Sequence, residues 1–404
     1  KGQEIHSEIM KKGFAEKDEV GNALIDMYCK CSYFAEAEST LENLSIKSLV
    51  SWNALISGYA DHDHAEEAIK CFSRMQVEGF HPNAFTYVSI VKSCNNIGAI
   101  DKGKELHLEI AKNGLLEGDR LLGSSLLDMY AKYGMLEKAQ EVFDGLAFHD
   151  VVSWTSLIAG YAEHGFGEAA LTCFEKMQHE SIPRDAITFI YILKACSSLG
   201  AVNKGEEICV EIFQAGLVDK DIDVGNALLD MYAKCGWPAK AMEVFEKLSD
   251  RDIVSWTTLA TAYALVGESE RTFSIVDKMT KQGENPNLVT FLCLLSVCSH
   301  TGLVSKALMY FKVMCEDFCF VPSVEHHGCI IDLLGRAGQL EVAMSLVKRM
   351  PFDCTSSEVW HTLLNACRKC GNVELGEQVF EHALVLDQGD TAAYVCMSNL
   401  YLEC

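Results

Sequence analysis

The chain has 404 residues, of which 49% are hydrophobic and 23% are charged, so it can bury a large core and is not an intrinsically disordered chain. Proline occurs only 6 times, which suits a mostly helical protein, and no run of about 18 apolar residues predicts a membrane span. The formal net charge of −23 excludes nucleic-acid binding through bulk positive charge. Any such binding must depend on a local basic stripe and on contacts to bases.

The 18 cysteines are scattered along the chain in helical contexts, and several recur at a fixed spacing. Disulfide frameworks and zinc sites instead place their cysteines in characteristic clusters. We therefore expect free, mostly buried cysteines that act as small hydrophobic side chains, with neither a metal nor another cofactor.

The sequence repeats with a period of 102 residues. Four ladders of identical residues share this period: Trp52, Trp154 and Trp256; Tyr59, Tyr161 and Tyr263; Cys94, Cys196 and Cys298; Asp26, Asp128, Asp230 and Asp332. Chance does not produce four ladders in one register, so the chain is predicted to be a repeat array.

Each period divides into units of 35, 36 and 31 residues. In chain order we expect a partial unit, a short unit, three triplets of units, a further unit and the start of another. Their ranges are 1–17, 18–48, 49–150, 151–252, 253–355, 356–390 and 391–404.

Each unit is predicted to be two helices joined by a short turn. In the unit that starts at Leu49, one apolar face runs along the first half and another along the second. The two faces comprise Trp52, Leu55, Ile56 and Tyr59, then Ala68, Ile69, Phe72 and Met75. Prolines, which end helices, fall at unit ends: Pro82, Pro183, Pro286 and Pro322. Because one hairpin cannot bury its apolar stripe alone, we expect an all-α solenoid of stacked antiparallel helix-turn-helix repeats.

Several segments resemble one known family. "VSWNALISGYA", "VSWTSLIAGYA", "GNALLDMYAKCG" and "VEHHGCIIDLLGRAGQLEVA" are similar to repeats of the plant pentatricopeptide repeat proteins in which long and short repeats alternate, the PLS subfamily. The resemblance implies a right-handed superhelix that binds single-stranded RNA, one base per repeat. It also implies import into mitochondria or chloroplasts.

The C-terminal part resembles the extension (E) motif of RNA-editing members of this family. "SSEVWHTLLNACRKCGNVELGEQVFEHALVLDQGD", residues 356–390, is similar to the first extension motif, and residues 391–404 to the start of a second. Residues 1–17 resemble the second helix of a long repeat, so we expect a fragment that lacks both ends. Editing members select cytidines for conversion to uridine, with a deaminase domain of the DYW kind in the same chain or supplied in trans.

In this family the fifth and last residues of each repeat contact one base. An ionised Asp at the last position accepts the ring N–H of guanine or uracil, whereas Asn or Ser can donate to adenine or cytosine. A short hydroxyl at the fifth position leaves room for a purine, and Asn favours a pyrimidine. Carried onto this chain, the pairs are Asn22 with Ser48 (cytosine), Asn53 with Asn83 (cytosine), Ser124 with Asp150 (guanine), Thr155 with Asp185 (guanine), Asn226 with Asp252 (uracil) and Thr257 with Asn287 (adenine).

The long repeats depart from this pattern, because Val88, Ile190 and Leu292 at their fifth positions cannot hydrogen-bond a base. Gly328, at the fifth position of the last short repeat, also predicts no base. The expected target is therefore 5′-C-C-n-G-G-n-U-A-n-n-3′, where n is any base. The alternative for all these polar residues is an ordinary helix cap or a solvated position.

A basic ladder with the same period stands at the end of the first helix of each short repeat: Lys30, Lys132, Lys234 and Arg336, with Lys369 in the matching place of the extension motif. These cations could bind RNA phosphates along an otherwise acidic body. Equally, they could favour the helix dipole at a C-terminus.

No catalytic constellation is convincing. The HxE motif of zinc deaminases occurs at His6–Glu8 and His107–Glu109, and a CxxC at Cys367–Cys370, but the latter lacks the preceding proline of the deaminase motif. We therefore expect a non-catalytic segment.

Three functions remain open. The chain could be a recognition factor for organellar C-to-U editing, with editing-complex proteins as partners. It could instead stabilise or process an organellar transcript without editing. A peptide-binding scaffold of the tetratricopeptide kind is the third alternative, although its uniform 34-residue repeat differs from the 31, 35 and 36 found here.

Overall fold

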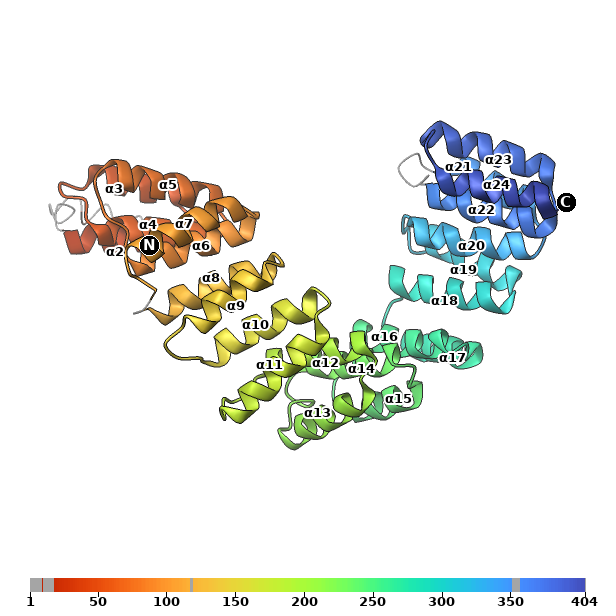
Figure 1. Ribbon diagram of the computed structural model, residues 1–404, viewed down its shortest axis with the longest axis horizontal. Coiled ribbons are helices and arrows are strands. Elements are labelled where there is room, and N and C mark those ends of the chain that lie inside the picture. The colour runs from red at the N-terminus through yellow and green to blue at the C-terminus, as the bar shows by residue number, and fades with distance from the viewer. Residues whose placement is uncertain (1–8, 10–17, 117–118, 351–356, 404) are drawn as a thin grey trace. The chain divides into compact units, whose positions relative to one another are not determined.

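A computed structural model describes residue 9 and residues 18–116, 119–350 and 357–403, and all regular structure within these ranges is helical (Figure 1). The predicted all-α solenoid is confirmed. The interpretation of residues 1–17 as part of a long repeat falls outside the described residues, apart from residue 9. Among the described helices, none is long and apolar enough to span a membrane.

The chain divides into two compact units, residues 1–195 and 196–404, and helix α12 (Ala186–Leu199) contains the boundary. The other helices of the first unit are α2 (Asp18–Lys30), α3 (Phe34–Asn43), α4 (Leu49–Asp61), α5 (Ala65–Val77), α6 (Ala84–Ile97), α7 (Ile100–Lys112), α8 (Arg120–Lys132), α9 (Leu136–Asp144), α10 (Val151–Glu163) and α11 (Gly167–His179).

The helices of the second unit are α13 (Val202–Gln214), α14 (Ile222–Lys234), α15 (Pro238–Lys247), α16 (Ile253–Leu265), α17 (Ser269–Lys281), α18 (Leu288–Thr301), α19 (Val304–Glu316), α20 (Val324–Arg336), α21 (Leu340–Arg349), α22 (Ser357–Cys370), α23 (Val373–Leu386) and α24 (Thr391–Glu403). In both units the even-numbered helices are the first helices of the hairpins and the odd-numbered helices are the second.

Within each unit the first helices form one row and the second helices cover it. In the first unit α4 packs between α2 and α6, and α8 packs between α6 and α10. In the second unit the row runs from α14 through α16, α18, α20 and α22 to α24. Within each unit the second helices contact their own first helices, as α5 contacts α4 and α15 contacts α14, and α5, α9 and α17 also contact the first helix of the next hairpin. This stacking buries the apolar stripes that no hairpin could bury alone.

Local sequence signals define the hairpins. Gly134 and Gly236 adopt φ values of +70° and +76° in the turn between the two helices of their short units, a backbone conformation that favours glycine. The tryptophan ladder lies in the core, because Trp52, Trp154 and Trp256 are each at most 3% exposed.

The cysteines follow the same packing. Among the described residues, nine cysteines are buried and none forms a disulfide: Cys29, Cys71, Cys94, Cys173, Cys196, Cys209, Cys293, Cys298 and Cys367. Burial raises the pKa of the Cys94 thiol to about 11 and that of Cys293 to about 12. These thiols are therefore protonated at neutral pH and pack as small hydrophobic groups.

Candidate nucleic-acid interface

The last residue of each polar pair caps the first helix of the next repeat. The Asn83 Oδ1 atom accepts a hydrogen bond from the Thr86 backbone N–H at 3.0 Å, and the Asp252 Oδ1 atom accepts one from the Ser255 N–H at 2.8 Å. Ser48, Asp150, Asp185 and Asn287 accept equivalent bonds. These last residues are therefore helix caps, and the cap fixes where each of their side chains lies.

The fifth residue lies about one turn into the preceding first helix, beside that cap. Asn53, Thr155, Asn226 and Thr257 are only 6–8% exposed, so their side chains are held against the protein. The Asn53 Nδ2 atom donates to Asn83 Oδ1 at 3.2 Å. In the second unit, Asn226 Nδ2 donates to Asp252 Oδ1 at 3.3 Å. The fold thus joins these two pairs across 30 and 26 residues of sequence.

A third residue, which the sequence reasoning missed, connects some of these pairs. Thr188 is the third residue of its repeat, and its hydroxyl lies 2.7 Å from Thr155 Oγ1 and donates to Asp185 Oδ1 at 2.6 Å. Thr86 has the same place in the preceding cycle, and its hydroxyl lies 2.6 Å from Asn53 Oδ1. The recurrence of Ser or Thr three residues after each cap is the signal that could have revealed this role.

The other three pairs are not hydrogen-bonded to each other within the described ranges. Thr257 Oγ1 donates to the Ile253 carbonyl of its own helix at 2.7 Å. Asn287 Oδ1 accepts a hydrogen bond from the Thr290 hydroxyl within the cap of α18. No direct bond joins Asn22 to Ser48 or Ser124 to Asp150. Their positions in the hairpins are nevertheless equivalent to those of the joined pairs.

A row of exposed apolar side chains borders the polar pairs. It consists of the second residue of seven first helices, each 48–72% exposed: Val50, Phe85, Leu121, Val152, Ile187, Val254 and Val289. Each lies three residues before a fifth residue, so the two share one face of the helix. Within each unit these side chains provide exposed apolar groups on the helix face that carries the fifth residues, suited to contact with the face of a base. Sequence reasoning missed it because apolar residues in a helical pattern were all assigned to the core.

Most of the predicted basic ladder is paired with carboxylates. The Lys30 and Lys234 ammonium groups lie 2.7 Å and 2.8 Å from Asp26 and Asp230, four residues earlier. Arg336 forms the same pair with Asp332. Lys132 instead donates to the Asn95 carbonyl at 3.4 Å. In the extension motif the residue four positions before Lys369 is the neutral Asn365, and no ion pair to Lys369 occurs among the described residues.

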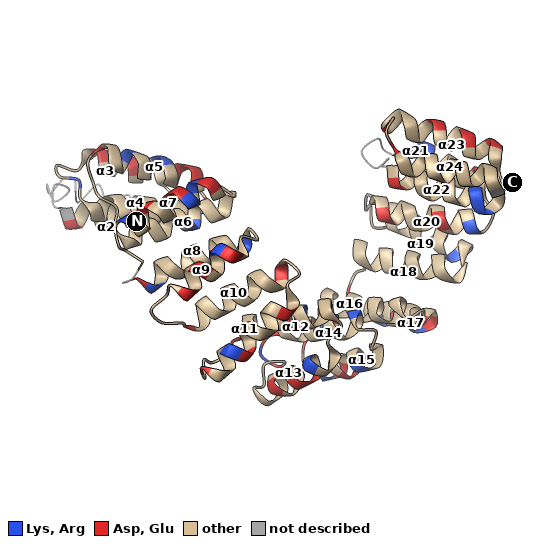
Figure 2. Cartoon of the chain, in the orientation of Figure 1, with Lys and Arg blue, Asp and Glu red and all other residues tan. Residues whose placement is uncertain are grey.

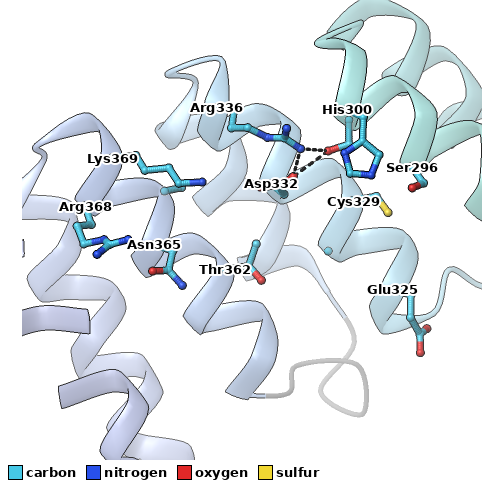
Figure 3. Close-up of a pocket in the computed structure, with 13 residues that line it drawn as sticks. Ser296, His300, Glu325, Cys329, Asp332, Arg336, Thr362, Asn365, Arg368 and Lys369 are labelled. Atoms are coloured by element: carbon cyan, nitrogen blue, oxygen red, sulfur yellow. Dashed lines mark hydrogen bonds and ion pairs between the residues drawn. The ribbon is translucent and has the colours of Figure 1, made fainter. Parts of the chain in front are cut away.

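A cavity of about 570 Å³ in the second unit is lined by residues of α18, α20 and α22. Figure 3 shows the residues that line it. Arg336 bridges Asp332 and the Ser299 hydroxyl, which lies 2.7 Å from its Nη2 atom. Gly328, at the fifth position of its repeat, has open space where a side chain would stand. Lys369 adds a cation to this cavity from α22.

The first helices differ in their negative charge: α2, α8 and α14 contain three, one and two carboxylates. Helices α4, α10, α16 and α18 together contain only two carboxylates, Asp61 and Glu163. The second helices, such as α5, α7 and α13, contain more acidic and basic residues, which are red and blue in Figure 2. The net charge of −23 is therefore unevenly distributed among the first helices.

The histidine and cysteine residues of the two zinc-like motifs, HxE and CxxC, do not form a metal site among the described residues. The His107 Nδ1 atom lies 2.9 Å from the Tyr130 hydroxyl, and burial lowers the pKa of His107. Cys367 is buried whereas Cys370 is exposed. His6–Glu8 lies outside the described residues. Within the ranges that are described, no three His, Cys, Asp or Glu side chains are grouped to hold a metal ion.

The repeats match three descriptions of one family. The PPR repeat family matches residues 47–96 and 149–198, and the pentatricopeptide repeat domain matches residues 250–301. The PPR repeat matches six stretches: 22–45, 124–147, 226–253, 289–317, 326–353 and 358–384. The chain belongs to the pentatricopeptide repeat family.

Relatives in Arabidopsis thaliana extend this result. A chloroplastic pentatricopeptide repeat-containing protein is 33% identical over 413 residues, covering 99% of this chain and 46% of that protein. A mitochondrial one is 34% identical over 381 residues, covering 94% of this chain and 59% of that protein. The chain thus spans about half the length of these pentatricopeptide repeat relatives.

The crystal structure of the pentatricopeptide repeat protein PPR10 from maize has a TM-score of 0.68 at 20% identity, covering 98% of this chain and 63% of that chain. PPR10 in complex with an 18-nucleotide psaJ RNA element matches with the same TM-score at 16% identity. These likenesses show the fold.

Proposed function

We propose that this pentatricopeptide repeat protein binds single-stranded RNA in a sequence-specific way, with one base for each repeat whose fifth and last residues are polar. The observation that carries the proposal is the contact between Asn226 and Asp252, and between Asn53 and Asn83. In these two pairs, residues 26 or 30 positions apart meet at the start of the next first helix, where their remaining hydrogen-bonding atoms can be shared with a base.

The chemistry of Asp252 illustrates how one such pair selects a base. Burial acts to raise the pKa of its carboxyl, but hydrogen bonds from the backbone N–H and hydroxyl of Ser255 and from Asn226 together hold the pKa below its usual range. The carboxylate is therefore an acceptor only. Its Oδ1 atom serves the helix cap, whereas the Oδ2 atom has only a long contact of 3.5 Å to Asn226. Oδ2 is thus suited to the ring N–H of uracil.

Three further features support RNA as the ligand. The exposed apolar row beside the pairs suits base faces, because apolar contact and stacking are available to every base. The first helices that carry several of the pairs are poor in carboxylates. The solved PPR10 complex, of the same fold, contains an 18-nucleotide RNA element.

Within this function, we infer that the chain acts as a site-recognition factor for C-to-U editing in a mitochondrion or chloroplast. The resemblance of residues 356–390 to the extension motif favours editing over stabilisation or processing of a transcript. Chloroplastic and mitochondrial relatives favour an organelle. The basic ladder is proposed to bind RNA phosphates, with RNA displacing or sharing the carboxylates that pair with Lys30, Lys234 and Arg336. Lys132 and Lys369 complete this set.

The test is binding of the purified chain at physiological salt to a labelled RNA containing 5′-C-C-n-G-G-n-U-A-3′ and to a scrambled RNA of the same composition. The proposal predicts clear preference for the first RNA. Equal affinity for both would contradict base reading, and binding to neither would favour the peptide-scaffold alternative. Editing is tested separately, by restoring C-to-U conversion in an organelle that lacks the full-length protein.

A further inference from the structure

The extension motif contains a pair of residues in the same place as the base-reading pairs. Helix α22 begins at Ser357, and its fourth residue, Trp360, is buried like the fourth-position tryptophans of the repeats. Its fifth residue is His361. Asp390 immediately precedes α24, as Asp252 precedes α16. The His361 Nε2 atom lies 2.5 Å from Asp390 Oδ2.

Asp390 caps a helix as Asp252 does, but its other oxygen is engaged more closely: His361 lies 2.5 Å from Asp390 Oδ2, whereas Asn226 reaches Asp252 Oδ2 only at 3.5 Å. The Asp390 Oδ1 atom accepts hydrogen bonds from the Ala392 and Ala393 backbone N–H groups, each at 3.1 Å, and so caps α24. Burial acts to raise the pKa of this carboxyl, but the bonds from Ala393 and His361 hold it below the usual range. Its Oδ2 atom therefore remains an ionised acceptor, directed toward the fifth residue.

We propose that the extension motif contacts one further nucleotide, 3′ to the last repeat, and that His361 and Asp390 select uracil there. This proposal rests on the proposed function. The eleventh position of the target would follow 5′-C-C-n-G-G-n-U-A-n-n-3′. The side chain of His361 is 24% exposed, so an RNA base can reach its free edge.

Two physical reasons point to uracil. Asp390 is an acceptor only, and among the bases only guanine and uracil present a ring N–H on the pairing edge. The imidazole of His361 is larger than the amide of Asn226 and leaves less room than a hydroxyl, which disfavours the double ring of guanine. The pair thus combines the acceptor of the Asn226 and Asp252 site with a bulkier fifth residue.

The experiment measures affinity of the whole chain for four RNAs that differ only at the eleventh position, with the seventh position kept as uracil. It compares the unmodified chain with Asp390→Asn, which retains a good helix cap. The control is Asp387→Asn, which removes the same charge three residues earlier, where Asp387 bonds the Gly389 N–H rather than His361. A second series varies the seventh position, so that base reading by the repeats is measured in the same samples.

The unmodified chain is expected to prefer uracil at the eleventh position by about tenfold, and Asp390→Asn to shift that preference to cytosine. Asp387→Asn should leave the preference unchanged. Equal affinity for all four bases at the eleventh position, with selectivity at the seventh retained, would overturn the inference alone. If the unmodified chain shows no base selectivity at either the seventh or the eleventh position, both the proposed function and this inference are overturned.

Discussion

Replacing Asp252 by Asn should convert a uracil-reading repeat into a cytosine-reading one without unfolding the protein. Asn is as good a helix cap as Asp, so the bond from Ser255 to Oδ1 can persist and the free energy of unfolding should change by less than about 0.5 kcal/mol. The second terminal atom changes from an acceptor to an N–H₂ donor. This donor opposes the uracil N3–H and matches the bare N3 of cytosine.

The size of the switch follows from the bonds that change. A hydrogen bond to a charged group contributes about 1.5–3 kcal/mol, so losing the carboxylate contact to uracil should weaken that RNA by at least about tenfold. Affinity for the cytosine RNA should rise. Fluorescence anisotropy with RNAs that differ only at the seventh position measures the ratio, and thermal unfolding checks the fold.

Asp221→Asn is the matched control. Asp221 also caps a first helix, accepting from the Asp223 N–H at 3.0 Å, but the fifth residue of its repeat is Ile190, which cannot hydrogen-bond a base. Its replacement should leave base preference unchanged. If Asp252→Asn folds normally yet keeps the uracil preference, or weakens all four RNAs equally, the reasoning about this pair is refuted.

Four further outcomes follow. Asn226→Thr should move preference at the same position from uracil toward guanine, measured in the same anisotropy series; unchanged preference would contradict a role for the fifth residue. Replacing Lys132 and Lys234 by Ala should weaken all RNAs alike and reduce the salt slope by about 0.7 per lysine, whereas an unaltered slope would remove them from the phosphate contacts. Trp154→Ala should destabilise the protein by about 3–5 kcal/mol in denaturant unfolding, because Trp154 is 2% exposed in the core; a loss below 1 kcal/mol would contradict that packing. The folded pKa of Asp252 is lowered, so its contribution to stability is present above the unfolded value of about 3.9 and is lost as pH falls through the folded pKa. The carboxylate therefore stays ionised between pH 7 and pH 5, and uracil preference should persist over that range. Loss of the preference by pH 5 would contradict the assignment.

The fold could be predicted because several independent signals coincide in each hairpin. The Trp52 ladder marks the buried face, and residues such as Asn83 place a cap where the next first helix begins. Helix period, cap and turn signals all agree, which is the condition for reliable inference from sequence.

The candidate site could be predicted only in outline. The sequence register gave the pairs, but not that Thr188 links Thr155 to Asp185, because that contact depends on how successive hairpins stack. The exposed second residues, such as Val152, were missed because an apolar helical residue is expected in the core.

The basic ladder shows a different limit. The ladders that contain Asp26 and Lys30 were both visible at the same period, and their separation of four residues places them side by side on a helix. The ion pair between them could therefore have been inferred from the sequence. The extension pair was overlooked because His361 is not one of the Asn, Ser or Thr residues expected at a fifth position.

The most direct test of the account is selection from a random RNA pool by the purified chain at physiological salt. Sequencing of the bound RNA should show enrichment of 5′-C-C-n-G-G-n-U-A-3′, with no preference at the positions that face the long repeats. Absence of any enriched motif, or a motif with other bases at the positions of the polar pairs, would contradict the claim that these pairs read RNA.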